Sequence, residues 1–513
     1  MPPTSSASTA PPQCTQHQMQ LIRSPLQPPF TANARNLIGF IISVLVGISI
    51  TPNASAQTPG YTGPSSATQA LIMGNWHIHP TLELRTQAEY RHNPFDLSSS
   101  SQSVEPTNNQ WWILSRARLG IAAERGPIRA VLELQDSRSW GESPAIDFGS
   151  RNSTPSTTAR LAFAELRGSK QRASFLRIGR QEIVWGDGRL LGASDWSHTG
   201  QSLDAARGNL VLGNANIDLF ASIIAYPGAT PAELQPNSPV LPRGSGTQLH
   251  GVRIAYHIAP LLHLESINLA RIARTIDYST DTNTTDNTNT LNTVNKYDEL
   301  SDLFATNLHA WGSSSSFSYS INGVFQFGRT TPLEQSLNQI AWAASAKAQY
   351  NSNLPWNLGL GIESSYATGQ NKDKTNDSTR FQPILPDTRL GGGNMGLYAW
   401  SNTMDAAGLI LLSPLEDTRI NLAYRYVALA EPSDQWLSAS LTKIGTDRSN
   451  EDRFLGHELD ARLETSPWTP VSLVAGYGAL LTGQGAKNIL EASGRGRPGA
   501  QHYGYVQLTV RMQ

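Results

Sequence analysis

The feature that most limits the fold of this chain is an alternation of apolar and polar residues with a period of two. Successive side chains of a β-strand point to opposite faces of a sheet, so this period is typical of strands. In the segment 419–426, Leu422 and Tyr424 share one face while Asn421 and Arg425 share the other. The same pattern recurs in other segments: 112–123, 128–135, 458–464 and 503–512. We therefore expect an all-β protein.

Strand length and the position of the aromatic residues separate a membrane barrel from a soluble sandwich. The alternating segments are about 10 to 13 residues long, whereas soluble strands usually have five or six and tilted membrane strands about 9 to 11. Aromatic residues gather near strand ends, as expected of the girdles at the two bilayer interfaces. The aromatic residues at these positions are Trp76, Tyr90, Trp111, Trp185, Tyr226, Tyr350, Trp356 and Trp468.

The connections alternate between short and long, which is the strongest argument for a barrel. Eight short turns are predicted at 124–127, 168–173, 213–215, 259–261, 312–315, 352–355, 414–417 and 466–469. Nine long polar loops are predicted at 93–110, 140–158, 185–202, 227–247, 275–300, 329–338, 369–402, 429–453 and 483–500. Short periplasmic turns and long extracellular loops are typical of outer-membrane barrels. The sequence thus predicts a transmembrane antiparallel β-barrel of about 18 strands, with no recognisable helix.

The first 56 residues differ from the rest and predict a cleaved signal peptide. Arg35 precedes an apolar run of 14 residues, 37–50, and the run is followed by the small triplet 54–56. A basic flank, a short apolar run and a small-residue cleavage site are typical of secretory signals. The run is too short for a membrane helix, which needs roughly 20 residues. Met19 is an alternative start, and residues 57–513 form the expected barrel domain.

Removal of this leader restricts the chemistry of the mature chain. It takes away Cys14, the only cysteine, so neither a disulfide nor a thiolate metal site is expected. Without Arg23 and Arg35, 37 of the 39 basic residues remain against 40 acidic ones. This slightly negative balance gives no reason to expect nucleic-acid binding.

One stretch resembles the signature of the alginate export family of outer-membrane porins. It runs from Arg177 through Trp185-Gly186-Asp187-Gly188 to Gly192, and is followed by Asp195-Trp196 and by residues 201–207. Weaker similarities lie at 456–460 and 381–387, so that the resemblance extends over roughly 70–513. The final strand also resembles a bacterial outer-membrane assembly signal, although it ends in Met512-Gln513 rather than in an aromatic residue.

The resemblance implies a channel in the bacterial outer membrane, surrounded by lipid, that passively passes an anionic polysaccharide or a related anionic solute. Neither ATP nor a cofactor is implied, and periplasmic export partners are compatible with it. Guanidinium groups pair with carboxylates in a fixed fork, which suits an arginine-lined constriction. The residues that fit pore lining or substrate binding are Arg116, Arg118, Arg129, Arg177, Arg180, Arg189, Arg207, Arg425, Asp187 and Asp195.

A purely structural role for these residues is an equally weighted interpretation. Opposite charges on neighbouring strands often stabilise a sheet, and Glu133 and Glu458 are expected on the same inner face as the arginines. Gly186, Gly188 and Gly192 are interpreted as structural, forming a sharp turn that carries the loop into the lumen. The acids Asp187, Asp195 and Asp204 either cap that turn or pair locally with Arg180, Arg189 and Arg207, and the sequence leaves this open.

Other functions are weaker interpretations of the same sequence. A general or uptake porin for small sugars or organic acids is the alternative to an exporter, and a plugged adhesive barrel is a third. No nucleophile motif is present, so we do not expect an enzyme. The glycines of 186–192 lack dinucleotide-binding spacing, and His77 and His79 have no acid in metal-binding spacing, so no metal is expected.

Overall fold

The computed structural model describes residues 71–94, 109–141, 157–168, 174–225, 246–259, 261–277, 296–331, 337–389 and 393–512. The predicted leader therefore lies outside the described residues. Eighteen strands form the barrel wall. They are β2 (Trp76–His92), β3 (Asn109–Arg125), β4 (Ile128–Trp140), β5 (Thr158–Arg167), β6 (Phe175–Gln181), β7 (Leu203–Leu212), β8 (Ala215–Ala225), β9 (Gly246–Ala259), β10 (Leu262–Asp277), β11 (Lys296–Ser313), β12 (Phe317–Thr331), β13 (Leu337–Asn351), β14 (Gly359–Ala367), β16 (Thr403–Leu415), β17 (Thr418–Leu429), β20 (Phe454–Trp468), β21 (Val471–Thr482) and β22 (Ala500–Met512).

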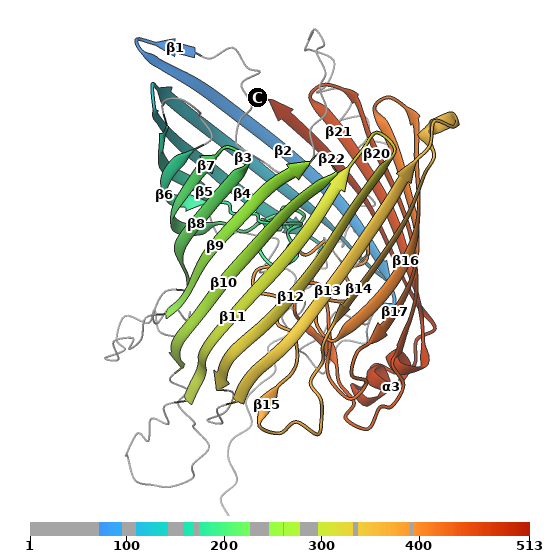
Figure 1. Ribbon diagram of the computed structural model, residues 1–513. Helices are drawn as coiled ribbons and strands as arrows, with labels where there is room; N and C mark the ends of the chain where they lie inside the picture. The colour runs from blue at the N-terminus through green and yellow to red at the C-terminus, as the bar shows by residue number, and fades with distance from the viewer. Residues whose placement is uncertain are drawn as a thin grey trace, which may run out of the picture. The chain divides into compact units, whose positions relative to one another are not determined.

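The wall is a closed ring of antiparallel strands (Figure 1). Each strand pairs with the next one along the wall, and the last strand, β22, pairs with the first, β2, from Leu82↔Met512 to His92↔His502. Closure leaves no sheet edge, as a lipid environment requires because it offers no water to unpaired backbone groups. The predicted barrel of about 18 strands is confirmed.

Short elements outside the wall extend its two ends. The strand β1 (Leu71–Met73) forms a hairpin with the start of β2, and β15 (Asp377–Ser378) pairs in parallel with β13. A small hairpin joins β18 (Trp436–Leu437) to β19 (Lys443–Gly445). Figure 1 shows β1 and the C-terminus at the end with the short turns, and β15 and α3 (Gln484–Ala492) at the opposite end. The long-loop end is extracellular and the short-turn end is periplasmic.

The alternation along each strand places apolar side chains on the outside and charged ones inside. In β2, Leu84 is 46% exposed on the lipid side, whereas the next residue, Arg85, is only 5% exposed within the barrel. The same holds in β4, where Ile128, Leu132 and Leu134 are exposed while Arg129 and Glu133 are buried. An outer apolar surface and a polar interior suit a barrel in lipid.

Three details differ from the sequence-based expectations. The strands have 7 to 18 residues rather than 10 to 13, because pairing such as that of β10 with β11 continues far toward the long-loop end. Trp185 does not belong to an aromatic girdle, since it is buried inside the barrel. A helix, α3, occupies the last long connection; its N-cap is Gly483, so no capping side chain marks its start, and packing of Ile489 and Leu490 stabilises it.

Most of the other predicted girdle residues that the structure describes lie at strand ends, and Trp356 is exposed in the short 3-10 turn Pro355–Asn357. Tyr90 and Trp111 are exposed at the long-loop end, and Tyr350 and Trp468 are exposed at the short-turn end. Within the described ranges, the structure contains no helix of the length and apolar character needed to cross a membrane.

Candidate functional site

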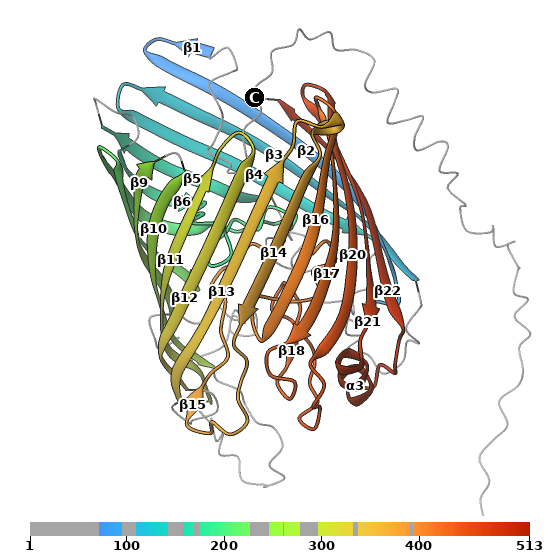
Figure 2. The ribbon, with the colours of Figure 1, turned by 45° about the vertical axis from the view of Figure 1, so that its right-hand side comes forward.

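Two of the long connections turn into the lumen of the barrel. The first, residues 182–202, joins β6 to β7, and the second joins β14 to β16 and is described over 368–389 and 393–402. They meet through a bridge between Leu191 and Leu385, and the Gly192 N–H donates to the Leu385 carbonyl oxygen at 2.8 Å. In both views of the molecule, coil segments cross the inside of the barrel (Figures 1 and 2). The two connections together therefore narrow the lumen.

The first connection, which we call the constriction loop (residues 182–202), is fixed to the inner wall by Trp185. The Trp185 ring packs edge-on against Phe220 of β8 at 4.9 Å, and its N–H donates to an Asp218 carboxylate oxygen at 3.3 Å. The wall makes room for the ring at Gly251 of β9, where a Cβ atom would lie 2.5 Å from it. The position of the loop therefore depends on tertiary packing rather than on local propensity.

Glycines allow the tight path of the constriction loop. Gly186 and Gly188 have φ angles of +63° and +81°, a region that residues with a Cβ atom rarely adopt. At Gly192 a Cβ atom would lie 2.7 Å from the backbone nitrogen of Asp387 in the second inward connection. This geometry supports the structural interpretation of the three glycines.

Four arginines of the wall surround the carboxylate of Asp195, which projects from the constriction loop. We call this group, Arg85 of β2, Arg116 and Arg118 of β3 and Arg160 of β5, the arginine cradle. Nitrogen–oxygen distances to the Asp195 carboxylate are 2.8, 3.1, 2.8 and 3.9 Å, respectively. The backbone carbonyl of Asp195 also accepts hydrogen bonds from Arg85 at 2.7 Å and Arg116 at 3.1 Å. The Asp195 side chain remains 37% exposed, so the cradle is not sealed.

Acidic residues on the wall balance much of the positive charge of the cradle. Glu83 accepts a hydrogen bond from Arg116 Nε at 2.9 Å, and Glu133 pairs with Arg160 at 2.7 Å. Glu182, at the start of the constriction loop, also pairs with Arg160. The cradle therefore binds one carboxylate tightly without forming a large excess of positive charge.

The cradle controls the protonation of two residues in the constriction loop. Burial alone would raise the pKa of Asp195, but Arg116, Arg85 and Arg118 hold that pKa well below its usual range. Burial, together with Arg116 and Arg85, lowers the pKa of His198 well below its usual range. His198 is fully buried, and neither ring nitrogen has a hydrogen-bond partner among the described residues. Asp195 is therefore anionic and His198 neutral near pH 7.

A second group of residues joins the constriction loop to β22, the strand that pairs with β2. The Arg389 guanidinium of the second inward connection lies 3.4 Å from the ring centre of Trp196 and 4.8 Å from that of Tyr505 in β22. Trp196 itself packs edge-on against Tyr505 at 4.9 Å. Nearby, the Asn394 N–H donates to Asp460 at 3.2 Å. Cation–π and aromatic contacts thus link both inward connections to the closing strand of the barrel.

The other arginines predicted from sequence pair with acidic residues; all of them lie on strands of the wall except Arg189, which belongs to the constriction loop. These ion pairs are Arg129 with Glu124 (3.1 Å), Arg177 with Glu165 (2.7 Å), Arg180 with Asp204 (2.7 Å), Arg189 with Asp187 (3.1 Å), Arg207 with Asp218 (2.9 Å), and Arg425 with Asp405 (2.8 Å) and Glu363. Of the predicted set, only Arg116, Arg118 and Asp195 meet at the cradle. The pairs between strands agree with cross-strand stabilisation, whereas the Arg189–Asp187 pair lies within the constriction loop.

The sequence left open whether the acids cap the turn or pair locally, and the structure has local pairs for two of them; Asp187 also accepts a hydrogen bond from the Arg189 backbone N–H at 3.1 Å. Asp187 pairs with Arg189 and Asp204 with Arg180. Asp195 instead pairs with arginines that lie 35 to 110 positions away, and Arg207 pairs with Asp218 of the neighbouring strand. Asp195 pairs with these distant arginines because the loop folds across the lumen and brings its carboxylate to β2, β3 and β5.

Sequence reasoning missed Arg85, Arg160 and Arg389. The alternation around Leu84 in β2 could have assigned Arg85 to the inner face, since it follows the same pattern as Arg116. Arg389 lies in an irregular connection, where no periodic signal shows which way a side chain points.

The comparisons with known proteins agree with this architecture. A sequence model described as "Alginate export" matches residues 80–223 and 269–495. No curated protein matches the chain. The fold is similar to that of OccAB1 from Acinetobacter baumannii, with a TM-score of 0.52 and 11% identity over 85% of this chain and 96% of that one.

Two further solved structures have the same fold at low identity. OccAB2 from Acinetobacter baumannii has a TM-score of 0.51 and 11% identity, with coverage of 84% of this chain and 98% of that one. OccK9 (OpdG) from Pseudomonas aeruginosa has a TM-score of 0.51 and 11% identity, with coverage of 85% and 98%. At such identity these likenesses show the fold alone.

Proposed function

Because the chain belongs to the alginate export family and forms a bacterial outer-membrane channel for anionic solutes, we propose that it passes carboxylated polysaccharide past the arginine cradle. The constriction loop and the wall formed by β2 to β5 make the selective point of the channel. Each uronate carboxylate in turn takes the place of the Asp195 carboxylate.

The single observation that carries this proposal is the occupation of the cradle by Asp195. Four guanidinium groups from three different strands converge on one carboxylate that comes from the lumen side. A guanidinium binds a carboxylate of any origin with the same fork geometry. Exchange of one carboxylate for another also avoids leaving buried cations unpaired, which is the costly state.

The surrounding acids suit passage rather than capture. A channel must bind its solute well enough to admit it and weakly enough to release it. Glu83, Glu133 and Glu182 lower the net charge of the cradle, since each pairs with one of its arginines. Passage then needs only a concentration gradient or a growing polymer behind it, and transport is passive.

A site that exchanges one carboxylate also accepts a small organic acid, which makes an uptake channel for such acids the second candidate. Polymer passage differs from small-acid passage in one measurable respect. A polymer long enough to occupy the constriction interrupts the current of small ions, whereas a small acid carries current itself.

The test is single-channel recording of the purified protein in planar bilayers under a KCl gradient. We expect a reversal potential that shows anion preference, reduced in Arg118→Ala, and interruptions of the current when alginate is added. Arg138→Ala is the matched control, because Arg138 is an exposed arginine paired with Asp136 on the outer face. A wide pore without ion preference, unaffected by alginate, contradicts the proposal. Current carried by monomeric uronate, with no interruption by alginate, favours the second candidate.

A further inference from the structure

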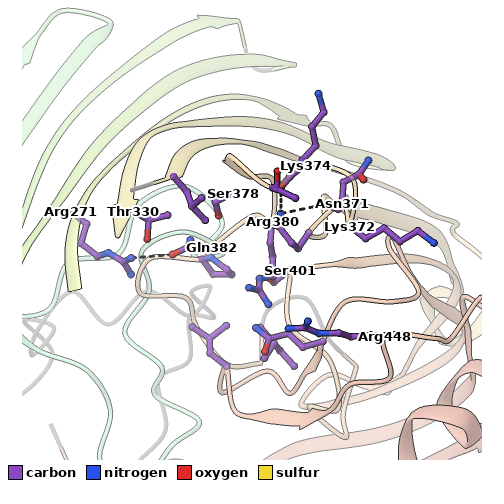
Figure 3. Close-up of a pocket in the computed structure, with 17 residues that line it drawn as sticks. Arg271, Thr330, Asn371, Lys372, Lys374, Ser378, Arg380, Gln382, Ser401 and Arg448 are labelled. Atoms are coloured by element: carbon purple, nitrogen blue, oxygen red, sulfur yellow. Dashed lines mark hydrogen bonds between the residues drawn. The ribbon is translucent and has the colours of Figure 1, made fainter. Parts of the chain in front are cut away.

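A separate cavity of about 800 Å³ lies at the extracellular mouth of the barrel. It is lined by the ends of β10, β12 and β13, by residues 370–383 of the second inward connection, and by the connection that carries the β18–β19 hairpin (Figure 3). Its volume falls within the range of ligand sites in proteins, about 300–1,000 Å³. None of the arginine cradle lines it.

The lining of this cavity, which we call the vestibule pocket, is cationic. Five of its seventeen residues are basic and none is acidic: Arg271, Lys372, Lys374, Arg380 and Arg448. Figure 3 shows Arg271 entering from one side and Arg448 from the other, with Arg380 between them and the two lysines extending at the rim. Charges gathered in a cavity raise the local concentration of anions.

These five basic side chains differ in whether they already form an ion pair or a hydrogen bond with other residues of the protein. Arg380 pairs with Asp434 at 3.2 Å, and Arg271 donates to the Gln382 side chain at 3.1 Å. Lys372, Lys374 and Arg448 are exposed, and within the described part of the chain none of them takes part in an ion pair. Positive charge at the rim is therefore open to an anion from outside.

Hydrogen bonds fix the floor of the vestibule pocket to the barrel wall. The Gln382 N–H donates to Gln326 of β12 at 2.9 Å, and Gln339 of β13 donates to the Arg380 carbonyl oxygen at 2.8 Å. Residues Asp377 and Ser378 add a short parallel strand to β13. A pocket held in place in this way loses little conformational entropy when a ligand binds.

Uncharged polar side chains complete a lining suited to sugars. Asn371, Ser378, Ser401 and Gln435 offer donors and acceptors for hydroxyl groups. The segment that holds the pocket also leads to the constriction, since it continues from Gln382 to Leu385, which pairs with the constriction loop. A chain leaving or entering the constriction therefore passes beside the pocket.

We propose that the vestibule pocket is a second anion site, which binds a short segment of a carboxylated saccharide at the cell surface. This inference rests on the proposed function for the class of solute, but on different residues. The basic side chains at the rim, Lys372, Lys374 and Arg448, pair with uronate carboxylates. The uncharged polar side chains of the pocket form hydrogen bonds with the sugar hydroxyl groups. The pocket holds the polymer at the mouth while the next carboxylate occupies the cradle.

The test measures direct binding of a fluorescently labelled alginate trisaccharide to the full-length protein in detergent, by fluorescence anisotropy. We expect the Kd to rise about tenfold in the double variant Lys372→Gln, Lys374→Gln and severalfold in Arg448→Gln, with a further rise as salt is increased. Lys443→Gln is the matched control, because Lys443 is exposed on the same extracellular connection but does not line the pocket. A neutral trisaccharide, maltotriose, is expected not to compete.

Several outcomes overturn the inference. Equal Kd values for the double variant and the Lys443 control contradict it, as does competition by maltotriose. Displacement of the label by inorganic phosphate at the same concentration as the unlabelled trisaccharide would show a general anion site instead.

Failure of this inference can be distinguished from failure of the proposed function. If ion selectivity and polymer block are present but the pocket variants bind normally, only the vestibule site is wrong. If binding depends on the pocket while the purified channel shows no ion preference, the role proposed for the arginine cradle is wrong and the vestibule site stands.

Discussion

The Asp195 carboxylate lies 2.8 Å from the Arg118 guanidinium, although 77 residues separate the two in the chain. The contact joins the constriction loop to the barrel wall, and Arg85 and Arg116 share the same carboxylate. A carboxylate tethered to the protein thus occupies the place that a carboxylate of the solute would need.

Substitution Asp195→Asn is expected to increase the anion preference of the channel. It removes the internal competitor and leaves the four arginines of the cradle with less compensation. The permeability ratio of chloride to potassium should rise about two- to threefold, since one charge is lost at a narrow point. Reversal potentials in a KCl gradient measure this ratio. Asp136→Asn, which alters an ion pair on the outer face, is the control, and an unchanged ratio in Asp195→Asn would show that the cradle lies off the ion path.

Lowering the pH from 7.5 to 5 is expected to release the constriction loop and increase conductance. The folded loop holds His198 neutral, so its pKa is lower there than in a released loop, where it is near 6.5. Neutral His198 therefore stabilises the folded position of the loop. This stabilisation is complete above about pH 6.5, and below that pH it weakens by up to about 1.4 kcal/mol per pH unit. The measurement is single-channel conductance as a function of pH.

The variant His198→Phe isolates this effect. Neither ring nitrogen of His198 has a hydrogen-bond partner among the described residues, so a phenyl ring replaces it without losing a bond. Asp387 acts in the opposite direction, because burial raises its pKa and its protonation at low pH favours the folded position. We expect the conductance of His198→Phe to stay constant or to fall as the pH is lowered. An increase equal to that of the native chain would assign the release to other groups.

Substitution Arg425→Ala is expected to destabilise the barrel more than it changes ion preference. Arg425 is buried and pairs with Asp405 of the neighbouring strand β16 and with Glu363 of β14, which would be left without this partner. Removal of one member of a buried ion pair costs about 3–5 kcal/mol. The unfolding temperature follows from the mobility of heated samples on gels. The double variant Arg425→Ala, Asp405→Asn should recover part of the loss, and a large change in selectivity without loss of stability would argue against a scaffolding role.

Substitution Gly179→Ala is expected to impair assembly of the barrel. Gly179 in β6 has a φ angle of +122°, and a Cβ atom there would lie 2.2 Å from the carbonyl oxygen of Ala162 in β5. Relief of this clash requires the β5–β6 pairing to shift, at a cost of about 1–3 kcal/mol. The fraction of heat-modifiable, folded protein in isolated outer membranes measures the effect. Gly408→Ala is the control, because no atom lies within 4 Å of a Cβ atom at that position.

Much of the barrel could be predicted from the sequence because the patterns that specify it lie within short segments of the chain. The period of two assigns each side chain to the lipid or the lumen, as Leu84 and Arg85 illustrate. Loop length assigns each connection to one side of the membrane. The connection predicted at 140–158 agrees within about two residues with the end of β4 at Trp140 and the start of β5 at Thr158. These features depend on neighbouring residues, so no tertiary contact is needed to infer them.

The barrel, its orientation and the inward face of Arg116, Arg118 and Arg425 follow from the sequence alone, since lipid outside and water inside impose a simple repeat. The contact of Asp195 with Arg85 across the lumen and the stacking of Arg389 on Trp196 follow only from the folded chain. Irregular connections carry no period, and their paths depend on where distant surfaces such as Phe220 and Tyr505 accept them. The wall therefore follows from local pattern, whereas the constriction follows from packing between segments far apart in the chain.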